Sequence, residues 1–100
     1  MYETWLPSDV EARLAKDKQL MIVDVREHDE WDRGHIAEAK HIRLGELTER
    51  KSELNKNQVT IIVCHSGARS AKACEYLSAE GYQVVNMLGG MSTWSGSIAR

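Results

Sequence analysis

A chain of 100 residues is long enough for one domain and too short for two, so we expect residues 1–100 to form a single domain. Its 42% of hydrophobic and 28% of charged residues are typical of a globular protein. The formal net charge of −2 and the lack of a basic stripe argue against nucleic-acid binding, and no apolar stretch approaches the roughly 20 residues that cross a bilayer. No secretory signal is visible at the N-terminus, which favours a reducing, cytoplasmic setting.

The first third of the chain predicts a helix, a buried strand and a helical turn. Pro7 opens the first helix, because a missing N–H costs nothing at the first helical position. The run 20–25 is apolar except for Asp24 and is rich in β-branched residues, as in a strand buried on both faces of a parallel sheet. The polar stretch 27–33 holds one helical turn, and Gly34 ends it.

The rest of the chain continues this alternation of strands and helices. The expected elements are a short strand at 40–44, a helix at 45–54, a strand at 59–63, a helix at 70–80 and a strand at 83–88. Gly81 suits the position just after a helix, and Trp94 docks a short final helix. Such alternation predicts an α/β fold with a mainly parallel sheet. The small, polar residues 95–100 suggest a frayed tail.

One segment concentrates the residues that can do chemistry. The strand at 59–63 runs directly into Cys64, His65, Ser66, Gly67, Ala68, Arg69 and Ser70, and a helix follows. Ligand sites in open α/β sheets lie outside the carboxyl ends of the strands. Free amides at the helix N-terminus, the helix dipole and the Arg69 cation would all favour a negative charge on the sulfur, and Gly67 permits a tight loop.

These features predict a depressed pKa for the Cys64 thiol. A free cysteine titrates near 8.5, whereas helix N-termini and cationic neighbours bring reactive cysteines down to roughly 3.5–7.5. The alternative is that Cys64 is only a buried structural thiol at the end of a strand. The glycine, the arginine and the helix start that follow it favour the reactive interpretation.

The chain resembles the rhodanese family over most of its length. The matching segments are Asp-x-Arg within 23–27, Gly-His-Ile-x-x-Ala-x-x-Ile at 34–42, the cysteine loop at 64–69, and Gly-Gly-x-x-x-Trp within 88–94. The resemblance implies an α/β, rhodanese-like domain with a five-stranded, mainly parallel sheet and helices on both faces. It also implies transfer of sulfane sulfur through a persulfide on Cys64.

Loop length separates two chemistries found on this type of fold. Cys64 and Arg69 have four residues between them, whereas the related dual-specificity phosphatases use Cys-x5-Arg. The shorter loop suits a sulfur atom better than a phosphoryl group, so the spacing favours a sulfurtransferase. The alternatives are a persulfide carrier with little thiosulfate turnover and a relative of the phosphatases or arsenate reductases.

The expected reaction is covalent catalysis without a metal or organic cofactor. Cys64 takes sulfur from a small anionic donor such as thiosulfate, and a thiol, a protein thiol or cyanide then accepts it. Arg69 attracts the donor and orients the loop, while the amides of residues 65–70 hold the charged sulfur. The two cysteines are too far apart for a Cys-x-x-Cys pair, and the histidines at 28, 35, 41 and 65 do not complete a zinc site.

Several residues beside the loop have both a structural and a functional interpretation. Asp24 and Arg26 form either an ion pair that supports the loop or part of the substrate site. His65 attracts the donor or simply points into solvent. His35 is expected to cap a loop, and Cys74 is expected to be core, because its helical register faces the sheet.

Overall fold

The structure is a computed structural model and describes residues 2–100. Five parallel strands form one sheet in the order β1-β5-β4-β2-β3. The strands are β1 (Glu3–Trp5), β2 (Met21–Asp24), β3 (Lys40–His41), β4 (Thr60–Val63) and β5 (Val84–Met87). The α/β fold with a five-stranded parallel sheet that the resemblance implied is therefore present, with β4 in the centre of the sheet.

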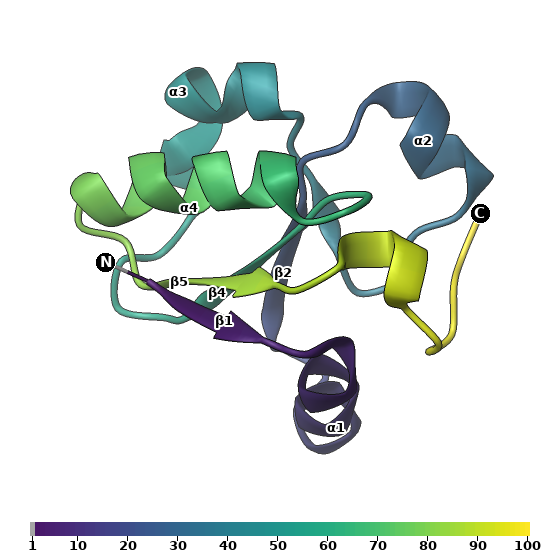
Figure 1. The fold of residues 1–100 in the computed structure, drawn as a ribbon. Coiled ribbons are helices and arrows are strands. Elements are labelled where there is room, and N and C mark those ends of the chain that lie inside the picture. The colour runs from purple at the N-terminus through teal and green to yellow at the C-terminus, as the bar shows by residue number, and fades with distance from the viewer. Residues whose placement is uncertain (1) are drawn as a thin grey trace.

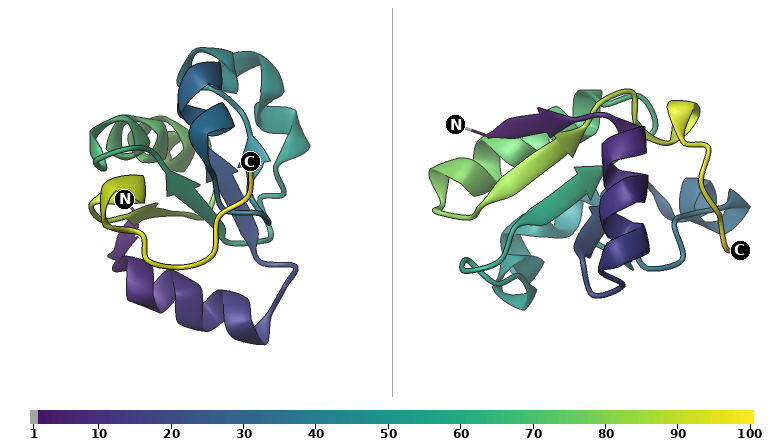
Figure 2. Two further views of the ribbon diagram at one scale, coloured as in Figure 1. Left: turned by 90° about the vertical axis from the view of Figure 1, so that its right-hand side faces the viewer. Right: turned by 90° about the horizontal axis from the view of Figure 1, so that it is seen from below.

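Helices cover both faces of the sheet, and Figures 1 and 2 show α1 on the face opposite to α3 and α4. The α-helices are α1 (Pro7–Lys16), α2 (His28–Arg33), α3 (Leu47–Arg50) and α4 (Ala68–Ala79). Three short 3₁₀ helices are η1 (Leu44–Glu46), η2 (Lys51–Glu53) and η3 (Gly90–Thr93). The segments α2 and η3 lie near the carboxyl ends of the strands, on the side where the chain ends (Figure 1).

Two apolar cores result, because consecutive side chains of a buried strand point to opposite faces. In β4, Ile61 packs on the α1 side with Val10, whereas Ile62 packs on the α4 side with Leu77. Cys64 belongs to the α4 side. The core thus holds the cysteine's backbone in place from the face that carries the following helix.

The structure corrects three boundaries drawn from the sequence. The segment 45–54 is not one helix but η1, α3 and η2 in succession. Helix α4 begins at Ala68, two residues before the expected start, so Arg69 and Ser70 lie in its first turn. The expected strand at 40–44 shrinks to two residues, because only Lys40 and His41 pair with β2.

Strand β1 was not anticipated at all. It pairs only with β5 at the edge of the sheet, and Glu3 and Thr4 are exposed, so it lacks the apolar pattern of a buried strand.

Within residues 2–100, no helix combines the length and the apolar character needed to cross a membrane.

The tail at 95–100 is anchored, contrary to the expectation of a frayed end. Ala99 exchanges two backbone hydrogen bonds with His35, of 3.0 and 2.7 Å, and Arg100 Nε donates to the carbonyl of Arg33. The tail therefore runs alongside the end of α2, as both views in Figure 2 show.

Candidate functional site

The Cys64 loop is a tight connection between β4 and α4. Its turn depends on Gly67, which has a φ of +104° and sits at the N-cap of α4. This left-handed backbone favours glycine, and a Cβ there would stand 3.3 Å from the amide nitrogen of Gly89. The glycine that the sequence singled out thus lets the loop fold back over its own cysteine.

The sulfur of Cys64 lies within a set of hydrogen-bond donors. The Gly67 amide donates to Sγ at 2.9 Å, and the Ser70 Oγ lies 3.2 Å from it. Burial acts to raise the pKa of the Cys64 thiol, but hydrogen bonds from the Ser70 hydroxyl and from the amides of Ser70, Gly67 and Ser66 outweigh it and hold that pKa below its usual value. This direction agrees with the depression expected from the sequence.

Ser70 connects the sulfur to the sheet. Its hydroxyl oxygen lies 2.5 Å from the Asn86 Oδ1 and 3.1 Å from the carbonyl oxygen of Gly67. Asn86 belongs to β5, is buried, and was missed by the sequence analysis. A polar residue in an otherwise apolar strand was the available signal, since a buried amide needs partners.

Arg69 pairs with Glu30 of α2. Two parallel hydrogen bonds of 2.6 and 2.7 Å join the guanidinium to the carboxylate. This pairing with Arg69 lowers the pKa of Glu30 to about 2. Glu30 was not a predicted site residue, because a single glutamate in a polar segment carries no signal of a partner 39 positions away.

The ion pair between Glu30 and Arg69 predicts that the stability of the fold depends on pH. The folded-state pKa of about 2 lies below the ordinary 4.5, so the pair stabilises the protein above pH 4.5 and is lost as the pH falls from there towards 2. Because both side chains are partly exposed, we expect Glu30→Gln to cost only about 1 kcal/mol at pH 7. Urea unfolding across this pH range should show a shallower loss of stability in Glu30→Gln than in the wild type. Glu49→Gln, at an exposed site, is the control, and equal pH slopes in all three proteins would contradict the assignment.

Asp24 and Arg26 form a buried ion pair at the end of β2. Arg26 Nε and Nη2 donate to the Asp24 carboxylate at 2.9–3.0 Å, and Nη2 also donates to the carbonyl of Gly34 at 2.8 Å. Asp24 is enclosed, whereas Arg26 reaches the surface of a cleft. The buried ion pair therefore explains Asp24 as a structural residue. Arg26 takes part in this ion pair and also lines the cleft.

The segment after β5 holds the Cys64 loop in place through backbone hydrogen bonds. The amide of Met91 donates to the Cys64 carbonyl at 2.7 Å, and the amide of Ser92 donates to the His65 carbonyl at 2.8 Å. Gly90 makes this approach possible, because a Cβ there would lie 2.3 Å from the Cys64 oxygen. The second glycine of the Gly-Gly motif thus allows the segment after β5 to pack against the cysteine loop.

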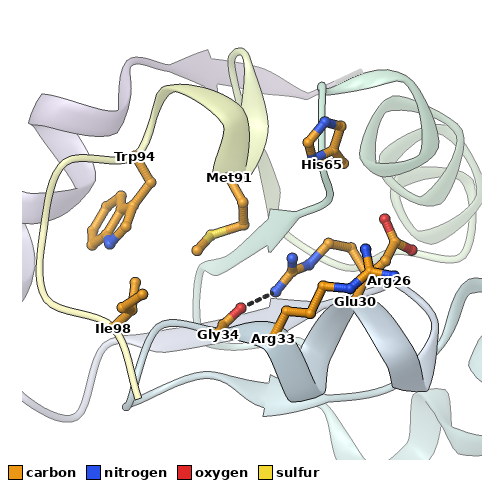
Figure 3. Close-up of a pocket in the computed structure, with 8 residues that line it drawn as sticks. All are labelled: Arg26, Glu30, Arg33, Gly34, His65, Met91, Trp94 and Ile98. Atoms are coloured by element: carbon orange, nitrogen blue, oxygen red, sulfur yellow. Dashed lines mark hydrogen bonds between the residues drawn. The ribbon is translucent and has the colours of Figure 1, made fainter. Parts of the chain in front are cut away.

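A cleft of about 440 Å³ opens beside the loop (Figure 3). Its lining consists of Arg26, Glu30, Arg33, Gly34, His65, Met91, Trp94 and Ile98. Cys64 is not part of this lining, since its side chain has no exposed surface. The sulfur is thus enclosed, and the tail contributes Ile98 to one wall of the cleft.

The other predicted residues divide between the site and the framework. His65, Ser66 and Ala68 are exposed on the loop. His35 caps α2 by donating from Nδ1 to the Trp31 carbonyl at 2.9 Å, as expected of a capping residue. Cys74 is core, and burial raises the pKa of its thiol to about 12.

Comparison with known proteins agrees with this architecture. The family model described as "Rhodanese-like domain" matches residues 6–97. YtwF of Bacillus subtilis, provisionally named a sulfurtransferase, is 39% identical over 84 residues, which cover 84% of this chain and 82% of YtwF. Thiosulfate sulfurtransferase GlpE of Coxiella burnetii is 32% identical over 82 residues, covering 81% of this chain and 77% of GlpE. The crystal structure of a rhodanese-like domain protein from Staphylococcus aureus superposes with a TM-score of 0.89 at 37% identity, covering 97% of this chain and 94% of that one.

Proposed function

The chain belongs to the rhodanese-like domain family, and we propose that it is a sulfurtransferase that carries sulfane sulfur as a persulfide on Cys64. The observation that carries this proposal is the convergence of the Ser70 hydroxyl and three loop amides on the Cys64 sulfur. Donors arranged in this way favour a negative charge on sulfur, both in a thiolate and in a persulfide.

The first step is attack by the Cys64 thiolate on the outer sulfur of thiosulfate. A sulfur–sulfur bond forms on Cys64, the bond to the sulfonate sulfur breaks, and sulfite leaves with the electron pair. The lowered pKa of Cys64 increases the fraction of the nucleophilic thiolate at a given pH. Thiosulfate is proposed because GlpE, a relative that is 32% identical, bears it in its name.

The second step returns the cysteine to its thiolate. A thiophilic acceptor, either cyanide or a thiol, including one on a protein, takes the outer sulfur from the persulfide. Donor and acceptor then react in turn with the same cysteine, so double-reciprocal plots are expected to be parallel. The charged cysteine must stay reduced between turnovers, which supports the cytoplasm as the proposed setting.

The remaining loop residues have supporting roles in this proposal. The amides of Ser66, Gly67 and Ser70 hold the sulfur, and Ala68 continues the turn into α4. Arg69 acts as a positioning residue, because its bond to Glu30 anchors the first turn of α4 to α2. Attraction of the donor then falls to His65 and Arg26, which line the cleft.

Intact mass spectrometry after incubation with excess thiosulfate tests the proposal. We expect the wild type and Cys74→Ala to gain the mass of one sulfur atom, and Cys64→Ala to gain nothing. An adduct that survives in Cys64→Ala would contradict the assignment of the cysteine. No adduct on any variant, even with an inorganic polysulfide as donor, would contradict sulfur transfer itself.

Steady-state turnover distinguishes the enzyme from its two alternatives. A persulfide carrier would load sulfur on Cys64 yet release little thiocyanate when thiosulfate and cyanide are supplied. A phosphatase would hydrolyse an aryl phosphate, and we expect no such hydrolysis, because the loop has four residues between Cys64 and Arg69.

A further inference from the structure

The sulfur of Cys64 is the first member of a buried chain of polar groups that runs from the loop into the sheet. The Ser70 Oγ lies 3.2 Å from Sγ, and the Asn86 Oδ1 lies 2.5 Å from that Oγ. All three residues are buried. Because buried polar groups need hydrogen-bond partners, this chain has to satisfy its own members in every charge state that the sulfur takes.

The Ser70 hydroxyl has one proton and three acceptors around it. The acceptors are the Cys64 sulfur, the Asn86 Oδ1 and the carbonyl oxygen of Gly67, which lies 3.1 Å from Oγ. A hydroxyl rotates to suit its surroundings, so its proton follows the strongest acceptor. The charge on the sulfur decides which acceptor this is, because a thiolate only accepts hydrogen bonds, whereas a thiol also donates one.

Asn86 suits both directions of the chain, because a side-chain amide has an acceptor on one side and a donor on the other. With a Cys64 thiol, the S–H donates to Oγ and the Ser70 hydroxyl donates to Oδ1, which faces Oγ in the structure. With a thiolate, the Ser70 proton turns to the sulfur, and Oγ then needs a donor in place of Oδ1. Half a turn of the amide about its last side-chain bond brings the Asn86 Nδ2 to that position.

This turn of the amide gives up little. The Asn86 Nδ2 makes a long contact of 3.4 Å to the carbonyl oxygen of Gly67. That oxygen keeps another partner, because the amide of Ala71 donates to it at 3.1 Å in the first turn of α4. The fixed donor to the sulfur is also unaffected, since the Gly67 amide is backbone and cannot reverse. The hydroxyl and the side-chain amide are therefore the parts of the chain that can follow the charge.

The titratable groups around Cys64 do not take over this role. Arg69 interacts electrostatically with Cys64 but is paired with Glu30. Cys74 keeps its proton near neutral pH, because burial raises the pKa of its thiol to about 12. His65 is exposed on the loop. The response to a charge on the buried sulfur therefore falls to the neutral polar chain.

We propose that Asn86 is a positioning residue whose amide turns with the charge on Cys64, so that the hydrogen bonds run towards a thiolate and away from a neutral sulfur. Asn86 acts through Ser70 and does not touch the reacting atoms. In the proposed sulfur transfer, on which this cycle rests, loading moves the negative charge from Sγ to the outer sulfur, and the chain turns away. When an acceptor attacks the outer sulfur, the sulfur–sulfur bond breaks, Cys64 leaves with the electron pair, and the chain turns back.

The side-chain ¹⁵N and ¹H signals of Asn86 test this reversal without any change in the chain itself. In a Cys74→Ala background, we expect them to titrate together with the ultraviolet absorbance of the Cys64 thiolate. In Ser70→Ala, the amplitude of this titration should shrink at least about threefold, because the chain is cut while the charge still acts through space. Asn86 signals that do not follow Cys64, or that titrate with equal amplitude in both proteins, would overturn the inference.

Asn86→Leu tests the same chain by removing both the donor and the acceptor at nearly constant size. The Ser70 oxygen then lacks a donor when its proton turns to the sulfur, whereas a neutral sulfur still leaves that proton the carbonyl of Gly67. The pKa of Cys64 should therefore rise, and sulfur loading at pH 7 should slow about threefold. In a Ser70→Ala background the same substitution should change neither quantity, since double-mutant cycles isolate such coupling. An equal rise of the pKa in both backgrounds would contradict action through Ser70.

Asn57→Leu is the matched control, because Asn57 is exposed in the turn before β4. It should leave the pKa of Cys64 and the loading rate unchanged. The absorbance and the Asn86 signals need no sulfur donor, so they decide on the chain separately from the function. Failure of the wild type to load sulfur from any donor would refute the proposed transfer, while a correct titration of Asn86 would still support the reversal.

Discussion

Ser70→Ala is expected to raise the pKa of Cys64 and to slow sulfur loading at pH 7 about tenfold or more. The Ser70 hydroxyl lies 3.2 Å from Sγ and is the strongest of the hydrogen bonds that lower the pKa of this thiol. A hydrogen bond to a charged group contributes about 1.5–3 kcal/mol, and about 1.4 kcal/mol corresponds to a factor of ten in rate. Burial raises the pKa of Cys64, and without the Ser70 hydroxyl fewer hydrogen bonds counteract this effect.

The pH dependence of loading, measured in a Cys74→Ala background, gives this pKa directly. The ultraviolet absorbance of the thiolate provides a second measurement that needs no donor. Ser66→Ala is the control, because Ser66 contributes its amide and has an exposed side chain. If Ser70→Ala and Ser66→Ala titrate like the wild type, the hydroxyl does not stabilise the thiolate.

Gly90→Ala is expected to destabilise the fold by about 3 kcal/mol and to displace the cysteine loop. The added Cβ would lie 2.3 Å from the Cys64 oxygen and 2.7 Å from the carbonyl atoms of His65. Both neighbours are backbone, which cannot move aside without breaking the bonds from Met91 and Ser92. The left-handed φ of +57° adds about 1–2 kcal/mol to an overpacking cost of about 1–3 kcal/mol.

Thermal unfolding should show this loss as a drop of at least about 10 °C in Tm, given about 4–8 °C per kcal/mol for a domain of this size. Sulfur loading at a temperature where Gly90→Ala remains folded should also be slower than in the wild type. Gly45→Ala is the matched control, because a Cβ at Gly45 meets no atom within 4 Å. A Tm for Gly90→Ala within the error of the Gly45→Ala value would show that the loop and the 90–92 segment are not in contact.

The central part of the fold was predictable because its signals are local. Buried strands such as β2 and β4 are short β-branched runs, and the residues of α4 show helical spacing between two glycines. The edge strand β1 was not predictable in this way, because its residues are largely exposed and only the pairing of Glu3 with Val85 makes them a strand.

The sequence by itself determined the cysteine loop, the proposed reactive centre, because the end of a strand, Cys64, Gly67 and the start of a helix follow one another closely in the chain and dictate where the amides point. Only the tertiary structure decided what surrounds this centre. Glu30 reaches Arg69 across 39 positions, Asn86 holds Ser70 from β5, and the tail from Trp94 onwards walls the cleft. Contacts of this kind depend on how the elements pack, and a polar or apolar residue far along the chain does not reveal its partner until that packing brings the two together.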